Sequence, residues 1–326
     1  MKTIAFIVSD YENESRRALL PEDIQNIQHK ENLFIEESYG EVLGYEDAAY
    51  EKMGAQIVSR KTALSKDIIC DLKINHAQYL KQLVPKQSVF GWLHAETNSE
   101  LTQLLVEKKL TAIAWEKMYD AGRHVFWKNN HIAGEAAILH AFTLFGKLAN
   151  ECKVALLGRG NVSMGAHKTL SALGADVKIF NRDTVPHLTE ELADFDMVVN
   201  GVMWDKSRED HLIYKKDLSK FKDHSMIVDI SADENGAIET SRPRNFKDPI
   251  YEVENVIHYT VNHTPTIYNR SVSRSISREV STYIDPLIEE KVKENQVLSK
   301  AMVIENGKIL RDKIKKAPKQ NISNKE

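Results

Sequence analysis

The sequence predicts an α/β fold with two domains, each built on a parallel sheet, separated by a cleft. Three observations support this. The chain has 326 residues, enough for two cores. Short apolar runs alternate with amphipathic helical segments through most of it, as in folds with helices on both faces of a sheet. With 42% hydrophobic and 28% charged residues, the composition is that of a globular protein that folds in water.

Residues 1–133 are predicted to form the N-terminal domain. The segments with strand or helix periodicity are Thr3–Val8, Glu22–Gln28, Leu33–Glu36, Tyr45–Met53, Gln56–Val58, Ile68–Ile74, Ser88–Trp92, Glu100–Lys108 and Thr111–Trp115. A helix is then expected from Ala133 to about Ala149.

Lys153–Asn181 predicts a βαβ unit, which makes residues 134–266 a second, Rossmann-like domain. Gly158 permits a tight turn from strand to helix, and Gly160 lets a pyrophosphate approach the backbone N–H groups of the helix. Ser163 takes the third position of the Gly-x-Gly-x-x-Gly pattern and is small enough for close packing. The motif predicts a dinucleotide site; the alternative is a glycine-rich turn that binds nothing.

The end of the second strand of this unit favours NADP(H) over NAD(H). NAD sites place an acid about 20 residues after the first glycine, where it binds the ribose 2′-OH. Here that place holds Asn181 and Arg182, and a guanidinium can pair with a 2′-phosphate. The alternative is that Arg182 is only a solvated turn residue.

The remaining segments complete both domains. Further strands of the second sheet are expected at Met197–Asn200, Met226–Ile230 and Ile250–Val253. Ile267–Lys293 is predicted to be a long helix broken at Pro286, and the segment 267–300 would complete the first domain. Residues 301–312 are expected to form a hairpin with an Asn-Gly turn, and 313–326 a disordered, lysine-rich tail.

Composition argues against several classes of function. The formal net charge of −3 gives no basic footprint for nucleic acid. No apolar segment reaches membrane-spanning length, so we expect a cytoplasmic protein with no membrane partner. Cys70 and Cys152 are expected to be core thiols, and no spacing predicts a metal site.

Two clusters in the N-terminal domain carry side chains suited to binding and proton transfer. Arg16 stands in Arg16–Pro21, just before a helix that begins with proline, where a guanidinium fork can hold a carboxylate. Lys73 follows an apolar run, and burial would lower its pKa toward neutrality. Two exposed arginines and a lysine that reaches outward to water are the structural alternatives.

Two further clusters follow predicted strands. His94 comes at the end of Phe90–Ala95, where α/β sheets place ligand-facing residues, and imidazole suits proton transfer at cellular pH. Val228–Gly236 is an apolar strand that leads into a carboxylate-rich loop. A structural histidine and a solvated acidic turn are the alternatives.

Taken in order, these motifs resemble the alanine dehydrogenase, saccharopine dehydrogenase and pyridine-nucleotide transhydrogenase superfamily, and within it the N5-(carboxyethyl)ornithine synthase family. The resemblance covers about residues 1–295. It is carried by Arg16–Pro21, Lys73, Gly91-Trp92-Leu93-His94, Trp127-Lys128-Asn129-Asn130, Gly158-Arg159-Gly160-Asn161-Val162, Ile230-Ser231-Ala232-Asp233 and Asn262-His263-Thr264-Pro265.

The resemblance implies an NADP-dependent oxidoreductase acting on CH–NH donors, with a catalytic cleft between the domains and an assembly of identical subunits. Arg16 resembles the arginine that binds a 2-oxo acid, with Glu116 and Arg123 as further substrate-binding residues. Lys73, His94 and Asp233 resemble the catalytic residues. The cofactor-binding residues that follow from the motif and the resemblance are Gly158, Arg159, Gly160, Asn161, Val162, Asn181, Arg182, Asn200, Gly201, Asn262, Thr264 and Pro265.

The implied reaction is a reductive condensation of pyruvate with the side-chain amine of ornithine or lysine, without free ammonia. One alternative is an alanine or saccharopine dehydrogenase-type oxidoreductase, which a requirement for ammonium would reveal. A catalytically silent NADP(H)-binding sensor and a purely structural interaction protein are alternatives of other classes.

Overall fold

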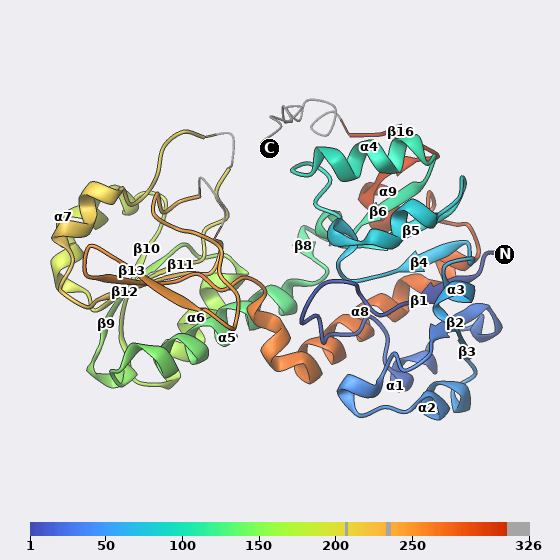
Figure 1. Cartoon of the computed structure of the whole chain (residues 1–326), viewed down its shortest axis with the longest axis horizontal. Coiled ribbons are helices and arrows are strands. Elements are labelled where there is room, and N and C mark those ends of the chain that lie inside the picture. Colours follow the sequence, from blue (N-terminus) through green and yellow to red (C-terminus); the bar gives the residue numbers. More distant parts are fainter. Residues whose placement is uncertain (206–207, 233–235, 312–326) are drawn as a thin grey trace, which may run out of the picture. The chain divides into compact units, whose positions relative to one another are not determined.

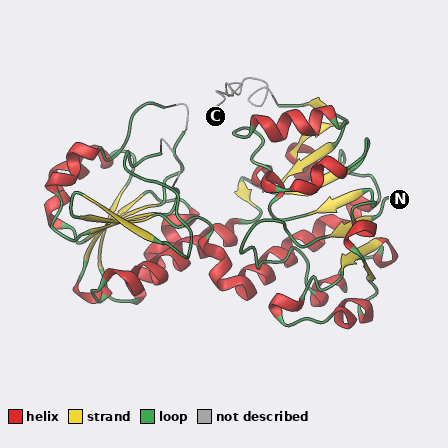
Figure 2. Cartoon of the chain, in the orientation of Figure 1, coloured by secondary structure: helices red, strands yellow, loops and turns green. Residues whose placement is uncertain are grey.

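The computed structural model describes residues 1–205, 208–232 and 236–311, and the chain falls into two compact units (Figure 1). Unit 1 comprises Met1–Phe126 and the C-terminal segment that begins at Asn269, whereas unit 2 comprises Trp127–Tyr268. In each unit the strands form a central sheet with helices around it (Figure 2). Both sheets are mainly parallel, which confirms the predicted α/β fold class.

The sheet of unit 1 has the strand order β16-β15-β6-β5-β4-β1-β2-β3. Strands β1 to β6 pair in parallel, and β15 and β16 extend the β6 edge in antiparallel fashion. The strands are β1 (Ile4–Phe6), β2 (Leu33–Glu36), β3 (Gln56–Val58), β4 (Ile68–Cys70), β5 (Ser88–Gly91), β6 (Thr111–Ala114), β15 (Met302–Glu305) and β16 (Lys308–Ile309), and a separate hairpin joins β7 (Tyr119–Asp120) to β8 (Arg123–His124). Val303 and Ile304 share one apolar core with the central strands, so the C-terminal segment is an integral part of this unit.

Local chemistry explains where several helices of unit 1 begin. Ser59 and Asn98 cap α3 and α4 by accepting backbone N–H groups, and Pro21 occupies the first turn of α1, where no N–H is needed. The α-helices are α1 (Pro21–Ile24), α2 (Asp47–Lys52), α3 (Arg60–Ala63), α4 (Ser99–Glu107), α8 (Asn269–Ile288) and α9 (Gln296–Ala301). The short 3-10 helices are η1 (Lys30–Asn32), η2 (Glu41–Leu43), η3 (Ile74–His76), η4 (Gln78–Gln82) and η5 (Trp115–Lys117).

Helix α8 fixes the N-terminal loop that carries Arg16. The hydroxyl of Ser273 accepts the N–H of Arg17 at 2.8 Å, and the hydroxyl of Ser277 accepts the N–H of Leu20 at 2.7 Å. The predicted break at Pro286 is wrong, because the helix continues to its end at Ile288. The proline lies in the last turn, where its missing N–H costs one hydrogen bond and does not interrupt the apolar face.

The sheet of unit 2 has the order β10-β9-β11-β12-β14-β13, with only β13 antiparallel. The strands are β9 (Lys153–Leu157), β10 (Asp176–Phe180), β11 (Met197–Asn200), β12 (Met226–Asp229), β13 (Ile250–Val253) and β14 (Val256–Tyr259), and the α-helices are α5 (Trp127–Phe145), α6 (Asn161–Ala172) and α7 (Leu188–Glu191). The 3-10 helices are η6 (Ala149–Glu151), η7 (Val185–His187), η8 (Leu192–Asp194), η9 (Lys215–Lys220) and η10 (Thr264–Tyr268). Alternate residues of β9 enter two different apolar cores, so both faces of the sheet are covered.

Two glycines allow the backbones of α5 and α6 to come into direct contact. A Cβ added to Gly134 would lie 2.0 Å from the carbonyl oxygen of Val162, and one added to Gly165 would lie 1.8 Å from that of His131. Helix α5 begins at Trp127, earlier than the expected start at Ala133.

Each sheet has a topological switch point, where the chain changes direction along the sheet. In unit 1 it lies between β1 and β4, because β2 and β3 extend one side of β1 and β4 to β6 extend the other. In unit 2 it lies between β9 and β11 for the same reason. Ligands of open α/β sheets bind at the carboxyl ends of the strands beside such points, so both places are candidate sites.

Candidate active site and cofactor site

The turn after β9 has the geometry of a phosphate-binding turn. Gly158 has a φ of +89°, and a Cβ added there would lie 2.9 Å from Cγ2 of Val202. Gly160 precedes α6, and a Cβ there would meet nothing within 4 Å. The space in front of Gly160 is therefore open toward the first turn of α6, where Asn161 and Val162 lie.

Ser163 locks this turn to its neighbouring strands. Its buried hydroxyl donates to the carbonyl oxygen of Leu157 at 2.8 Å. A Cβ added to Gly201 would lie 2.5 Å from the same hydroxyl, so the end of β11 packs directly on the start of α6. The small residues predicted for close packing thus join β9, α6 and β11 at the switch point.

Two arginines follow paired strand ends at the same edge of the sheet. Phe180 is in register with Leu157, and Arg182 and Arg159 each stand two residues beyond those partners. Both arginines are exposed, and neither forms a hydrogen bond or ion pair with any residue in the described ranges. Asn181 supports this turn, because its Oδ1 accepts the N–H of Asp183 at 2.9 Å.

Asn200 braces the end of β11. It is 1% exposed; its Nδ2 donates to Oδ1 of Asp229 at 2.9 Å and its Oδ1 accepts the N–H of Val202 at 3.1 Å. The side-chain amide of Asn200 thus has internal hydrogen-bond partners, and the backbone of the adjoining Gly201 lies at the switch point. Asp233, the predicted acid of the following loop, lies outside the described residues.

The loop after β14 is tied to α5. Thr264 is buried, and its hydroxyl donates to the carbonyl oxygen of Ala133 at 3.0 Å. Pro265 is also buried, whereas Asn262 is exposed. Tyr259 is in register with Val228 on β12, so this loop begins at the same carboxyl edge as the glycine turn. Of the three residues, Asn262 presents its side chain to solvent and the other two hold the loop.

In unit 1, Arg16 is a buried cation with an internal partner. It is 2% exposed; its Nε donates to Oε1 of Glu14 at 2.8 Å, and its Nη2 donates to Oε2 at 2.6 Å. The guanidinium carbon also lies 5.2 Å from the ring centroid of Trp92, which follows β5. These contacts orient the guanidinium at the carboxyl edge of the sheet.

Lys73 lies beside Arg16 at the switch point. Burial, and then the charge of Arg16, lower the pKa of Lys73 to about 8, although Glu14 and Asp71 act in the opposite direction. Its Nζ lies 5.2 Å from the centroid of the Tyr11 ring. A lysine with this pKa can give or take a proton near neutral pH.

His94 follows β5 and has a φ of +50°, a strained backbone for histidine. The carboxylate of Glu116 holds this turn, because it accepts the N–H of Leu93 at 3.2 Å and that of His94 at 2.6 Å. Glu116 was predicted to bind substrate, yet both of its oxygens bind this turn. Cys70 is in register with Phe90, so Lys73 and His94 follow adjacent strands at one edge.

Arg123 lies in the β7–β8 hairpin, in register with Asp120. Its charge acts on Glu279 of α8, where it opposes the upward effect of burial on the pKa of that carboxyl. The structure thus brings Arg16 and Lys73 together and places His94 on the next strand, while Arg123 is associated with α8.

Comparison with known proteins decides the family. Residues 9–128 match the alanine dehydrogenase/PNT N-terminal domain, and residues 182–312 match the alanine dehydrogenase/PNT C-terminal domain. The chain belongs to the alanine dehydrogenase/PNT family. Membership places it among oxidoreductases that act on amino acids with a nicotinamide coenzyme.

Among curated relatives of this family member, an N(5)-(carboxyethyl)ornithine synthase from Clostridium botulinum is 32% identical over 287 residues, covering 83% of this chain and 90% of the relative. One of the same name from Lactococcus lactis is 28% identical, covering 83% and 92%. Alanine dehydrogenase 1 from Staphylococcus aureus is 23% identical, covering 94% of both chains. These names confirm the resemblance expected from the motifs.

Solved structures give the same fold. An L-alanine dehydrogenase superposes with a TM-score of 0.87 at 23% identity, covering 97% of this chain and 98% of that one. A transhydrogenase from Sinorhizobium meliloti gives 0.81 at 18% identity, covering 95% and 100%.

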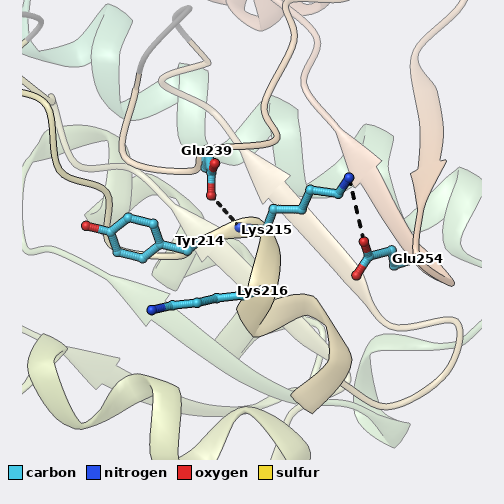
Figure 3. Close-up of a pocket in the computed structure, with 5 residues that line it drawn as sticks. All are labelled: Tyr214, Lys215, Lys216, Glu239 and Glu254. Atoms are coloured by element: carbon cyan, nitrogen blue, oxygen red, sulfur yellow. Dashed lines mark hydrogen bonds and ion pairs between the residues drawn. The ribbon is translucent and has the colours of Figure 1, made fainter.

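A surface pocket of about 460 Å³ lies on unit 2 and is lined by Tyr214, Lys215, Lys216, Glu239 and Glu254 (Figure 3). Its charged residues bind one another: Glu239 accepts the backbone N–H of Lys215 at 2.6 Å, and Nζ of Lys215 lies 3.8 Å from Glu254. Glu254 lies in the turn before β14, at the amino edge of the parallel strands. The pocket is therefore at the edge opposite the candidate cofactor site.

Across residues 1–205, 208–232 and 236–311, no three His, Cys, Asp or Glu side chains gather as a metal ion would require. Within those ranges, no helix combines the length and apolarity needed to cross a membrane.

Sequence reasoning missed two carboxylates of unit 1, Glu14 and Asp71. Both act on Lys73, and Glu14 also holds Arg16. Asp71 is two residues before Lys73, and Glu14 is two residues before Arg16, so an acid two residues before a candidate cation was the available signal.

Proposed function

We propose that this family member is an NADPH-dependent oxidoreductase that condenses a 2-oxo acid, pyruvate, with the side-chain amine of ornithine or lysine. The product would be an N-(1-carboxyethyl) amino acid. The names of the Clostridium botulinum and Lactococcus lactis relatives, N(5)-(carboxyethyl)ornithine synthases, support ornithine as the amine and a carboxyethyl product.

The observation that carries the proposal is that two cations, Arg16 and Lys73, lie close enough at the switch point of unit 1 for the charge of Arg16 to lower the pKa of Lys73. A buried guanidinium there would bind the carboxylate of the 2-oxo acid through charge-assisted hydrogen bonds. The neighbouring Lys73 would then meet the carbonyl group. Because the lysine is partly buried, its charge acts on the carbonyl more strongly than it would in water.

The condensation needs protons to move twice, and the residues of this edge can move them. The unprotonated amine adds to the carbonyl, and the resulting carbinolamine loses water when its hydroxyl is protonated. Lys73, with a pKa of about 8, holds its proton at neutral pH and can release it to that oxygen. His94 would exchange protons with the attacking nitrogen. When bound, NADPH supplies the hydride that reduces the imine carbon.

The residues of unit 2 fit NADP(H). The open face of Gly160 leaves room for the pyrophosphate at the first turn of α6. Arg159 and Arg182, exposed beyond adjacent strand ends, would hold the 2′-phosphate of the adenosine ribose.

The test is a panel of NADPH or NADH, pyruvate or 2-oxoglutarate, and each basic amino acid or ammonium. Coenzyme oxidation is followed by absorbance and the product by mass spectrometry. We expect oxidation only with NADPH, pyruvate, and ornithine or lysine, with a product mass equal to the two substrates minus one oxygen. Oxidation supported by ammonium alone would refute the condensation.

A second candidate is an ammonia-using amino-acid dehydrogenase, which the alanine dehydrogenase relative from Staphylococcus aureus favours. The ammonium arm of the same panel tests it. A silent NADP(H)-binding sensor is the candidate of a different class; it would bind the coenzyme and turn over no substrate pair. The shifted pKa of Lys73 argues against a sensor, because a protein that only binds a coenzyme has no use for a titrating lysine.

A further inference from the structure

Asp71 is a buried carboxyl group directly after β4, at the switch point of unit 1. It is 0% exposed. Its Oδ1 accepts the backbone N–H of Lys73 at 3.0 Å, and its Oδ2 accepts the phenol of Tyr79 at 3.0 Å. A Cβ added to Gly91 of β5 would lie 1.8 Å from the carbonyl oxygen of Asp71, so this turn packs at backbone contact with the next strand.

Deepening the proposed function, on which this inference rests, we propose that Asp71 is a positioning residue for the condensation. Its carboxylate fixes the turn that presents Lys73, and its charge keeps the Lys73 amine protonated until the carbonyl oxygen needs a proton. The resemblance and the sequence motifs gave Asp71 no role.

The surroundings of Asp71 act on its pKa in opposite directions. The pKa of Asp71 is raised to about 6, mainly by burial; hydrogen bonds from Lys73, Ser9 and Tyr79 act to lower it, and the charge of Asp10 acts to raise it. Arg60 is a cation on which the charge of Asp71 also acts, and its guanidinium pairs with Asp10 and Glu36. With a pKa of about 6, Asp71 is mostly ionised at neutral pH. It forms no salt bridge with any residue that the structure describes, and its charge acts on Lys73.

The groups around Lys73 shift its pKa in opposite directions. Burial and Arg16 lower the pKa of Lys73, whereas Glu14 and Asp71 raise it. The raised pKa of Asp71 means that the fold loses stability from this group as pH rises through about 6. Asp71→Asn removes the ionisable carboxyl group and with it this loss of stability. The asparagine keeps an oxygen that can accept the N–H of Lys73, so we expect the variant to fold.

Loss of the Asp71 charge should lower the pKa of Lys73. We expect the unprotonated fraction of the amine at pH 7 to rise by about threefold or more in Asp71→Asn, since each pKa unit is a factor of about ten. Tyr79→Phe keeps the carboxylate but removes a bond that lowers its pKa. That variant should shift Lys73 in the same direction by a smaller amount.

The direct test is the pH dependence of acetylation of Lys73 by acetic anhydride, measured on the intact chain by peptide mass spectrometry. It needs neither substrate nor coenzyme. A lower midpoint in Asp71→Asn than in wild type supports the proposal, and an equal or higher midpoint overturns it. Asp223→Asn, which removes an exposed acid of unit 2, is the matched control and should leave the midpoint unchanged.

Kinetics then test whether the effect reaches the reaction. In the pH profile of kcat/KM for pyruvate at saturating ornithine, the limb that belongs to Lys73 should move to lower pH in Asp71→Asn, together with the labelling midpoint. If the acetylation midpoint of Lys73 shifts in Asp71→Asn but the limb of the kcat/KM profile does not move, the proposed role of Asp71 in catalysis is wrong. If wild type condenses no substrate pair, the proposed function fails, and the labelling result still decides whether Asp71 controls Lys73.

Discussion

Replacing Arg182 should change which coenzyme this family member accepts. The residue is exposed beyond β10, where an NAD-binding fold usually has an acid, and its guanidinium has no partner in the described parts of the chain. Arg182→Ala would remove the proposed partner of the 2′-phosphate without disturbing any internal contact that the structure records.

The magnitude follows from the kind of contact. A hydrogen bond to a charged group contributes about 1.5–3 kcal/mol, and solvent exposure reduces this toward the lower end. We therefore expect Arg182→Ala to weaken NADPH binding by about tenfold and to leave NADH binding within about twofold. Arg159→Ala should act similarly. The double variant should lose less than the product of the two factors, because both residues would share one phosphate.

The assay is fluorescence titration with NADPH and with NADH, at low and at high salt. Wild-type binding of NADPH should weaken with salt more than that of NADH, since screening acts on the phosphate contacts. Lys215→Ala, which removes a positive charge at the opposite edge of the same sheet, is the control. Equal loss of NADPH and NADH binding in Arg182→Ala would refute the reasoning, and so would wild-type preference for NADH.

Two further predictions concern the proton-transfer residues and the glycines. Lys73→Ala and His94→Ala should each lower turnover by about 10²-fold or more while NADPH binding, measured by fluorescence, stays unchanged; full activity would remove the assignment. Gly165→Ala forces a Cβ to 1.8 Å from the carbonyl oxygen of His131, so thermal unfolding should show a loss of several kcal/mol, of order 3. Gly160→Ala meets nothing and should weaken nucleotide binding with little change in stability.

Strand positions could be predicted where a short apolar run stood alone. Met197–Asn200 and Ile250–Val253 were predicted with the bounds that the structure has. The strand β14 was missed because His258 interrupts its apolar run. That side chain is 0% exposed, and its Nε2 lies 2.8 Å from the hydroxyl of Thr240, so a local pattern could not reveal its burial.

The candidate residues of the sheet edges were predictable for a related reason. Parallel strands end at a common edge, so residues that follow several strands come together whatever their separation in sequence. Side-chain partners were not predictable in this way. The predicted roles of Glu116 in substrate binding and of Asn200 in coenzyme binding stay predictions. The contacts of Glu116 with the backbone of the His94 turn and of Asn200 with Asp229 could not be read from the sequence. Both depend on which polar group lies within about 3 Å after folding.

Four charged groups around the switch point of unit 1 compensate one another's charge, which makes their removal from water less costly. Glu14 and Asp71 are acids, Arg16 and Lys73 are bases, and the four sum to zero when all are ionised. A 2-oxo acid that binds there adds one negative charge, which a buried site would resist. In the proposed reaction, Lys73 gives its proton to the departing hydroxyl, so the positive charge passes from the lysine to the protonated imine and the net charge of the site does not change at the step that precedes reduction.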